Sequence, residues 1–280
     1  MKFDSNRAWT DAMAAVRANR EVLLALGGVF FLLPTLLSTV FLTDVQTRIM
    51  ATMAQPEVLK QVMRENLGMM LAFGVGGGVA QMIGYLAVTS LISDRQRPTV
   101  GESIRAGLRA LPSLFAVAVI VFLGVMLATV AITMLVAGLF ALIGAPRAGS
   151  MVAVVLLMMA LAYAAIKLSL VVPVIVNEGV RNPVGAMARS WRLTRRNSAR
   201  LFGFYLLLTL GYFVLAITLT LVLAGPVMLL LGQGGFALMI MGVVSGAISA
   251  AASVVLAAVV AQTHRQLAGP TPEFAASPFE

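Results

Sequence analysis

Six long apolar runs restrict the folds that are open to this chain. They cover residues 22–43, 69–92, 113–143, 151–176, 201–223 and 236–262 and contain a single charged residue, Lys167. Spanning a hydrocarbon core about 30 Å thick takes roughly 20 apolar residues as helix. Lipid offers backbone amides no partner, and the two-residue alternation of a β-barrel strand is absent. We therefore predict an all-α polytopic membrane bundle of six transmembrane helices.

The composition agrees with one membrane domain rather than a soluble one. Hydrophobic residues make up 60% of the chain and charged residues 11%, against about 45–50% and about 25% in soluble domains. We assign residues 1–268 to a single six-helix transmembrane domain and 269–280 to a short cytoplasmic tail. The first run is too long for a signal peptide core and lacks a small-residue cleavage site after it, so we expect it to be a mature helix.

The cations are distributed unevenly between the two sides of the predicted bundle. Fifteen lie on the side of the two termini: Lys2, Arg7, Arg17, Arg20, Arg95, Arg97, Arg105, Arg109, Arg181, Arg189, Arg192, Arg195, Arg196, Arg200 and Arg265. Four lie on the other side: Arg48, Lys60, Arg64 and Arg147. This positive-inside bias predicts a bacterial-type inner membrane protein with both termini in the cytoplasm. It also accounts for the net charge of +9 through anionic lipid headgroups, so we expect no nucleic-acid partner.

Each cytoplasmic segment before an odd-numbered span has the pattern of a short amphipathic helix, near 5–20, 99–111 and 183–196. The apolar positions follow helical spacing in Trp9, Ala12, Met13 and Val16, in Val100, Ile104, Leu108 and Leu111, and in Val184, Met187, Ala188 and Trp191. We predict three repeats of one interfacial helix plus two spans. Such helices either only anchor the bundle or also form a collar that binds lipids or a protein partner in the membrane.

Residue types that carry catalysis are scarce. The chain has no cysteine and one histidine, His264, which we place at the start of the tail. None of its eleven acids lies in the middle of a span, and no metal, nucleophile or nucleotide-binding motif occurs. We therefore expect no enzyme activity, no catalytic residue, no metal and no cofactor.

Lys167 is the ionisable residue that lies well inside a span. It is about nine residues from the cytoplasmic end, so roughly 13 Å deep at 1.5 Å per residue. Intramembrane charges usually face a bundle interior or a wet cavity, which indicates a ligand site. In the alternative interpretation, Lys167 snorkels to the cytoplasm and pairs with Glu178.

Small residues and prolines interrupt the spans. Gly74, Gly76, Gly77 and Gly78 predict close helix packing, with a flexible break at a pore as the alternative. Gly242 and Gly246 predict a similar small-residue face in the last span. Pro34 and Pro173 each remove a backbone donor and predict kinks.

One loop carries a family resemblance. Asn182-Pro183, then Arg189-Ser190-Trp191-Arg192-Leu193-Thr194 and Asn197, resembles the signature of the glycerophosphoryl diester phosphodiesterase membrane-domain family. The Ala8-Trp9 helix followed by Phe30-Phe31-Leu32-Leu33-Pro34 is similar to that family's opening. The resemblance implies multi-pass inner-membrane helices. In some relatives the membrane domain precedes a catalytic domain, which we expect this chain to lack.

These patterns together favour a non-catalytic inner-membrane protein that interacts with lipids or is accessory to membrane homeostasis. The alternative is a small-molecule or lipid transporter with a cavity near Lys167. The expected partners are membrane lipids, anionic headgroups included, and a protein in the membrane. The candidate ligand or lipid contacts are Trp9, Lys167, Glu178, Arg189, Trp191, Arg192 and Arg196.

Overall fold

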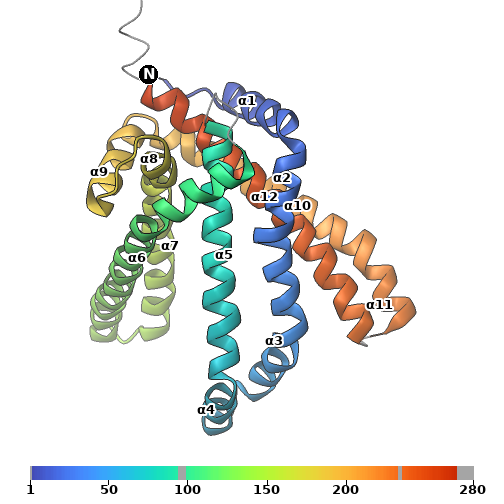
Figure 1. The fold of residues 1–280 in the computed structure, drawn as a ribbon. Helices are drawn as coiled ribbons and strands as arrows, with labels where there is room; N and C mark the ends of the chain where they lie inside the picture. Colours follow the sequence, from blue (N-terminus) through green and yellow to red (C-terminus); the bar gives the residue numbers. More distant parts are fainter. Residues whose placement is uncertain (1, 94–98, 233–234, 270–280) are drawn as a thin grey trace, which may run out of the picture.

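The computed structural model describes residues 2–93, 99–232 and 235–269, and within these ranges the chain is helical and has no strand (Figure 1). The elements are α1 (Ser5–Ala18), α2 (Arg20–Gly27), η1 (Gly28–Leu32), α3 (Leu33–Thr52), α4 (Pro56–Glu65), α5 (Leu67–Ser93), α6 (Val100–Leu142), α7 (Pro146–Leu168), α8 (Val171–Asn177), α9 (Pro183–Thr194), α10 (Ser198–Leu219), η2 (Thr220–Ala224), α11 (Gly225–Leu231) and α12 (Gly235–Ala268). The elements η1 and η2 are π-helical turns. Nearly all of the predicted tail, 270–280, lies outside the described residues.

Six stretches of the described chain are long and apolar enough to cross a membrane. They are Arg20–Thr52, Leu67–Ile92, Val100–Leu142, Arg147–Asn177, Ser198–Val227 and Met239–Ala268. Each overlaps one predicted run, so the all-α class and the six spans are confirmed. The chain is thus a multi-pass membrane protein.

Two parts of the helix pattern differ from expectation. Residues 99–111 do not form a separate helix, because Val100–Leu142 is one continuous α6 with Pro112 inside it. The first turns of α6 pack tightly on α5, where a Cβ on Gly107 would lie 3.2 Å from the carbonyl oxygen of Ile83. Helix α4, which we did not predict, lies after the first span and has no buried residue. The three-repeat arrangement remains a prediction.

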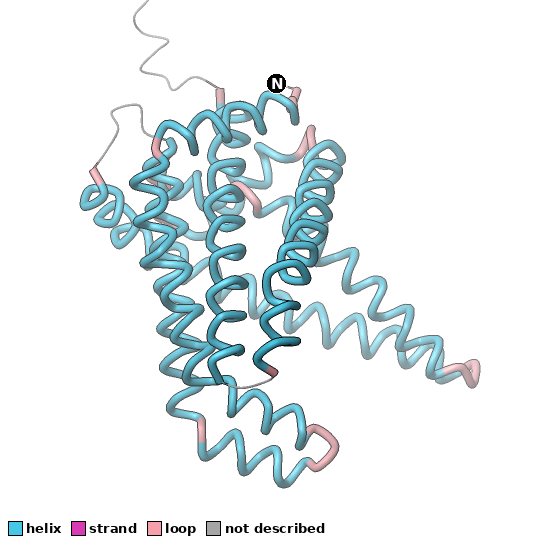
Figure 2. The backbone as a smooth tube through the Cα atoms, turned by 90° about the vertical axis from the view of Figure 1, so that its right-hand side faces the viewer, coloured by secondary structure: helices cyan, strands magenta, loops and turns pink. Residues whose placement is uncertain are grey.

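Both ends of the described chain lie at the same end of the molecule. The Asp4 amide donates a hydrogen bond to Gln266 Oε1 at 3.3 Å and so joins the start of the chain to the end of α12. Figure 1 shows α1 and α9 at this end and α4 at the other. Figure 2 shows that the helices gather near the N-terminus and diverge away from it. We call the gathered end the terminal end.

The buried core lies near the terminal end. One cluster joins α1, α2, α5, α10 and α12 through residues such as Ala12, Leu26, Val88, Leu201 and Ala258. A second cluster packs α8 and α9 against α5 and α6 and contains Leu86, Ala110, Val174 and Ala186. Helices α8 and α9 are therefore packed against α5 and α6.

The glycine prediction was right for α12 and wrong for most of α5. A Cβ on Gly242 would lie 2.7 Å from Thr39 Cγ2, so α12 and α3 approach closely there. Gly77 faces Pro34 at 3.7 Å, but Gly74, Gly76 and Gly78 have no atom within 4 Å of a built Cβ. The physical reason is that nearly consecutive residues project from a helix in different directions, so these four glycines cannot all face the same neighbouring helix.

The predicted prolines lie beside irregular helix. The π-helical turn Gly28–Leu32 directly precedes α3, where Pro34 lies in the first turn. Pro173 lies in α8, and the helix is broken between Leu168 and Val171, one turn earlier. Proline has no backbone N–H, so it removes the helical hydrogen bond to the carbonyl of the residue four positions earlier. In both cases the irregular stretch of helix includes that earlier residue.

Candidate functional site

A helix break between α7 and α8 forms the base of the site, and α9 bridges it. Ser190 Oγ donates to the Lys167 carbonyl at 2.7 Å and accepts from the Leu170 amide at 3.2 Å. Ser190 is fully buried. One hydroxyl thus satisfies a donor and an acceptor that the break would leave unpaired inside the protein. This contact holds α9 against the break.

The Lys167 ammonium group lies in a closed environment between α7, α9 and α10. The side chain is 3% exposed, and Nζ donates to Ser198 Oγ at 2.8 Å. Nζ also lies 5.4 Å from the ring centre of Tyr163 and 5.3 Å from that of Trp191. These two rings meet edge to face at 5.6 Å. Aromatic faces attract the charge while they shield it from lipid.

Glu178 joins three elements at the terminal end. It follows α8, where Gly179 takes a left-handed backbone with φ of 67° and turns the chain toward α9. Its Oε2 accepts from Arg189 Nε of α9 at 2.9 Å, and its Oε1 lies 3.0 Å from His264 Nε2 of α12. Lys167 is not among the ion-pair partners of Glu178 in the described chain. The pairing considered for snorkelling is therefore replaced by these contacts.

Opposing effects set the pKa of Glu178. Partial burial by itself would raise the pKa, but hydrogen bonds from Arg189 and His264, together with the Arg189 charge, outweigh it and hold the pKa below its usual range. The carboxylate is thus ionised at neutral pH. His264 is 4% exposed and belongs to α12 rather than to a tail, which corrects its predicted position. The reason is that α12 extends through Ala268, so this end of the helix is covered by the bundle.

The two predicted tryptophans and the other predicted arginines are partly or fully exposed. Trp9 on α1 is 38% exposed and Trp191 on α9 is 42% exposed, while Arg192 and Arg196 are also exposed. The structure thus brings Lys167 together with Trp191 and Glu178 together with Arg189. It keeps Trp9, Arg192 and Arg196 at the surface of the same end.

Sequence reasoning missed the polar side of α9. Ala186, Ser190 and Thr194 repeat at every fourth residue and form the buried face of this helix. They pack against the bundle, and the predicted apolar face with Val184 and Trp191 is left exposed. The signal was a stripe of small residues at helical spacing inside the signature loop. Ser198 and His264 carried no comparable signal.

The arrangement suits structural and electrostatic roles. The described residues include no group of three or more histidine, cysteine, aspartate or glutamate side chains that could hold a metal ion. In the described chain the Glu178 carboxylate contacts both Arg189 of α9 and His264 of α12, so these polar contacts join the helices together.

Comparisons with known proteins agree with the signature loop. No curated protein and no solved structure gave a match. The family model for the membrane domain of glycerophosphoryl diester phosphodiesterase matches residues 141–269, from the end of α6 through α12. This segment contains the helix break, Lys167, Glu178 and the whole of α9. The resemblance that the signature loop indicated is therefore confirmed over residues 141–269, which match this family model.

Proposed function

We propose that the protein is a non-catalytic, lipid-interacting protein of the bacterial inner membrane, accessory to membrane homeostasis, with both termini in the cytoplasm. In this proposal α1 and α9 form a collar at the cytoplasmic membrane surface. A protein partner within the membrane is compatible with this role. The observation that carries the proposal is the pair of half-exposed tryptophans, Trp9 and Trp191, on two helices at the terminal end.

Charge and amphipathicity support the collar. Arg192 and Arg196 are exposed beside Trp191, and most of the chain's cations belong to segments at the terminal end. Tryptophan favours the headgroup level of a bilayer, and arginine favours the phosphates above it. A helix with both residue types on its exposed side is suited to lie in the membrane surface. Arg95 and Arg97, which contribute to the charge bias, lie outside the described residues.

The transporter alternative gains less support from the geometry. Lys167 would have to present its ammonium group to a cavity, but Ser198, Tyr163 and Trp191 surround that group. The two aromatic rings and the Ser198 hydroxyl already make the contacts to the ammonium group that a bound solute would have to make. This arrangement favours a structural role for Lys167 and favours lipid interaction at the surface of α9.

The proposal is tested by lipid selectivity in nanodiscs of phosphatidylcholine with and without phosphatidylglycerol. Native mass spectrometry should find phosphatidylglycerol retained in preference to phosphatidylcholine. Arg192→Gln should weaken this retention about fivefold, as expected for one cation near an anionic surface. Equal retention of the two lipids by the unmodified protein would contradict the proposal.

Tryptophan depth gives a second measurement. The chain has two tryptophans, so Trp9→Phe and Trp191→Phe each leave one reporter. Brominated lipids should quench both reporters to a similar and shallow depth. A reporter that responds only to a water-soluble quencher would remove its helix from the collar.

A further inference from the structure

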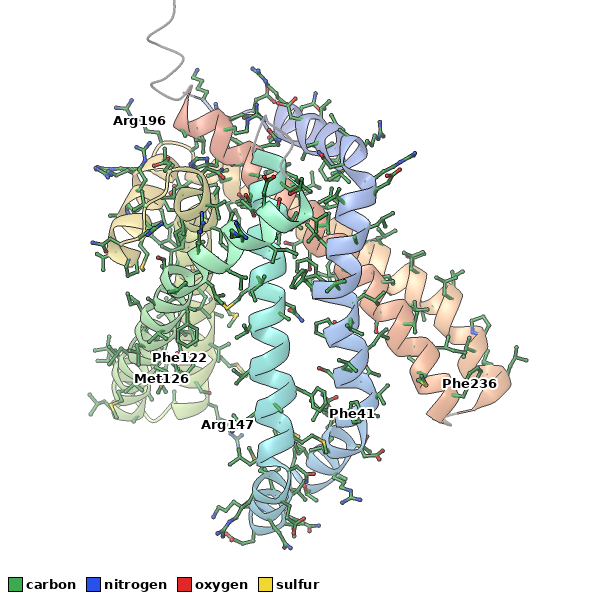
Figure 3. All side chains as sticks on the ribbon, viewed as in Figure 1. Phe41, Phe122, Met126, Arg147, Arg196 and Phe236 are labelled. Atoms are coloured by element: carbon green, nitrogen blue, oxygen red, sulfur yellow. The ribbon has the colours of Figure 1, made fainter. Side chains whose placement is uncertain are left out.

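A pocket with a basic lining opens where the start of the chain meets the junction between α9 and α10. Its lining residues are Lys2, Arg196, Asn197, Ala199 and Arg200, and its volume is about 490 Å³. Pockets of this size accommodate a small organic group rather than a lone ion. Figure 3 shows Arg196 at the terminal end of the molecule. The pocket that Arg196 lines therefore lies at this end.

Specific contacts bring the two distant segments together. The Phe3 amide donates to Asn197 Oδ1 at 3.0 Å, and this hydrogen bond is buried. The Phe3 ring, 4% exposed, packs on Phe204 of α10 with ring centres 5.4 Å apart. Together with the bond from Asp4 to Gln266, these contacts fix the chain next to Lys2. The backbone beside Lys2 is thus held next to the start of α10, and the exposed side chains of Lys2, Arg196 and Arg200 line the pocket between them.

The charge of the lining identifies the ligand chemistry. Lys2, Arg196 and Arg200 are cationic, and none of the described residues that line the pocket is acidic. The ion pairs of the described chain involve the cations Arg7, Lys60, Arg189 and, when protonated, His264. The three pocket cations are therefore in none of these ion pairs. Three cations around one cavity repel one another unless an anion lies between them. Arginine forks match the oxygen atoms of phosphate groups especially well.

We propose that this pocket binds a phosphoryl group at the cytoplasmic membrane surface, carried by an anionic lipid headgroup or by a soluble phosphate ester. Arg196 and Arg200 hold the phosphoryl oxygens, and Lys2 closes the site from the N-terminal segment. The inference rests on the proposed function in one respect, namely that the terminal end, and with it the pocket, faces the cytoplasm. It adds Lys2, Asn197 and Arg200 to the residues that contact lipid or solute.

The most direct variant is Ala199→Glu, which places a carboxylate in the pocket. Ala199 is exposed in the first turn of α10, where an acidic residue stabilises the helix. The variant should therefore fold and block anion binding. Ala199→Gln has nearly the same size without the charge and is the matched control. The double variant Lys2→Gln/Arg200→Gln should weaken binding about twenty-five-fold, and Arg105→Gln/Arg109→Gln is its control at exposed cations elsewhere.

Two binding arms separate the sources of the phosphoryl group. In the first, native mass spectrometry counts phosphatidylglycerol retained in mixed nanodiscs. In the second, calorimetry follows inorganic phosphate added to nanodiscs of phosphatidylcholine alone. Loss of retained lipid in Ala199→Glu, without binding of inorganic phosphate, identifies a headgroup site. Binding of inorganic phosphate that Ala199→Glu abolishes identifies a site for soluble phosphate esters.

Three other outcomes would contradict the proposal that this pocket binds a phosphoryl group. Equal losses in Ala199→Glu and Ala199→Gln would show that the charge is not the cause. Equal losses in both double variants would show attraction to the surface as a whole. If the protein prefers phosphatidylglycerol and Arg192→Gln weakens that preference, but both pocket variants bind normally, the collar stands and the pocket is wrong.

Discussion

At the scale of single residues, buried polar groups explain how an apolar bundle tolerates a broken helix and a cation. Ser190 supplies a donor and an acceptor to the break, while Ser198 and two aromatic rings surround the Lys167 ammonium group. Ser198 Oγ in turn donates to the Thr194 carbonyl at 2.9 Å. The hydroxyl groups on α9 and α10 therefore connect Lys167 to the backbone.

Ser190→Ala should lower the free energy of unfolding by about 1–3 kcal/mol, because it leaves a buried amide and a buried carbonyl without their shared partner. Thermal unfolding in detergent measures the loss. Ser150→Ala is the control, since the Ser150 hydroxyl is exposed and bonds only within α7. Similar melting temperatures for the two variants would show that the break does not depend on Ser190.

Lys167→Met should change the free energy of unfolding by less than about 1 kcal/mol, with neutral or stabilising sign. Methionine fills the space between Tyr163 and Trp191, and removing a buried charge offsets the lost hydrogen bond. Copurifying lipid should stay unchanged, because the ammonium group is already enclosed. Lipid loss from a variant that melts normally would instead support a ligand site at Lys167.

At the scale of elements, small residues and one carboxylate set how the helices meet. Gly242 allows α12 to approach α3, and Glu178 ties the end of α8 to α9 and α12. The amphipathic pattern of α9 predicted a helix correctly, but its polar stripe decides which side faces the bundle. Ser190 on this stripe makes the hydrogen bonds to the α7–α8 break, while Val184 stays exposed.

Gly242→Ala should destabilise the bundle by about 1–3 kcal/mol, because the new Cβ would lie 2.7 Å from Thr39 Cγ2 and push α3 and α12 apart. Gly76→Ala is the matched control in α5, where no atom lies within 4 Å of the built Cβ. It should be neutral or stabilising by up to about 1 kcal/mol, since alanine favours helix. Equal unfolding midpoints would contradict this packing.

Glu178 should make the fold sensitive to acid. Its folded-state pKa is lowered, so the stability it contributes is complete above its ordinary pKa of about 4.3 and is lost as the pH falls through the lower folded value. The melting temperature should therefore drop more steeply in the unmodified protein than in Glu178→Gln as the pH is lowered from 5 to about 3. Parallel curves for the two proteins would exclude this contribution.

At the scale of the whole molecule, one end is packed and charged and the other end is open. The buried clusters gather at the terminal end, and the spans diverge toward the end that holds α4 (Figures 1 and 2). The α10 span is almost entirely exposed in this single chain. Lipid or another membrane-embedded protein must cover this apolar surface in the bilayer.

The proposed orientation rests on the fifteen cations on one side and the four on the other. Reporter fusions or cysteine labelling should place residues 144–150 outside and residues 177–200 in the cytoplasm. The chain has no native cysteine, so each introduced thiol reports one site. Labelling of the second segment from outside would reverse the proposed topology.

The sequence by itself determined the helical class, the six spans, their order and the charge bias, because these depend on hydrophobicity and charge along the chain. It also contained the resemblance around Trp191, which lies within the residues that match the family model, 141–269. Fold class in lipid follows from local composition, since backbone amides must be paired within a helix or a closed barrel and the alternation of a barrel strand is absent.

Only the tertiary structure decided which polar residues meet. Ser190 on α9 contacts the Lys167 carbonyl, His264 on α12 contacts Glu178, and Asn197 contacts Phe3 near the start of the chain. These pairs are separated by 23, 86 and 194 residues. No local sequence pattern predicts pairs so far apart in the chain. Which residues meet depends on how the helices pack and on which buried groups still need a hydrogen bond.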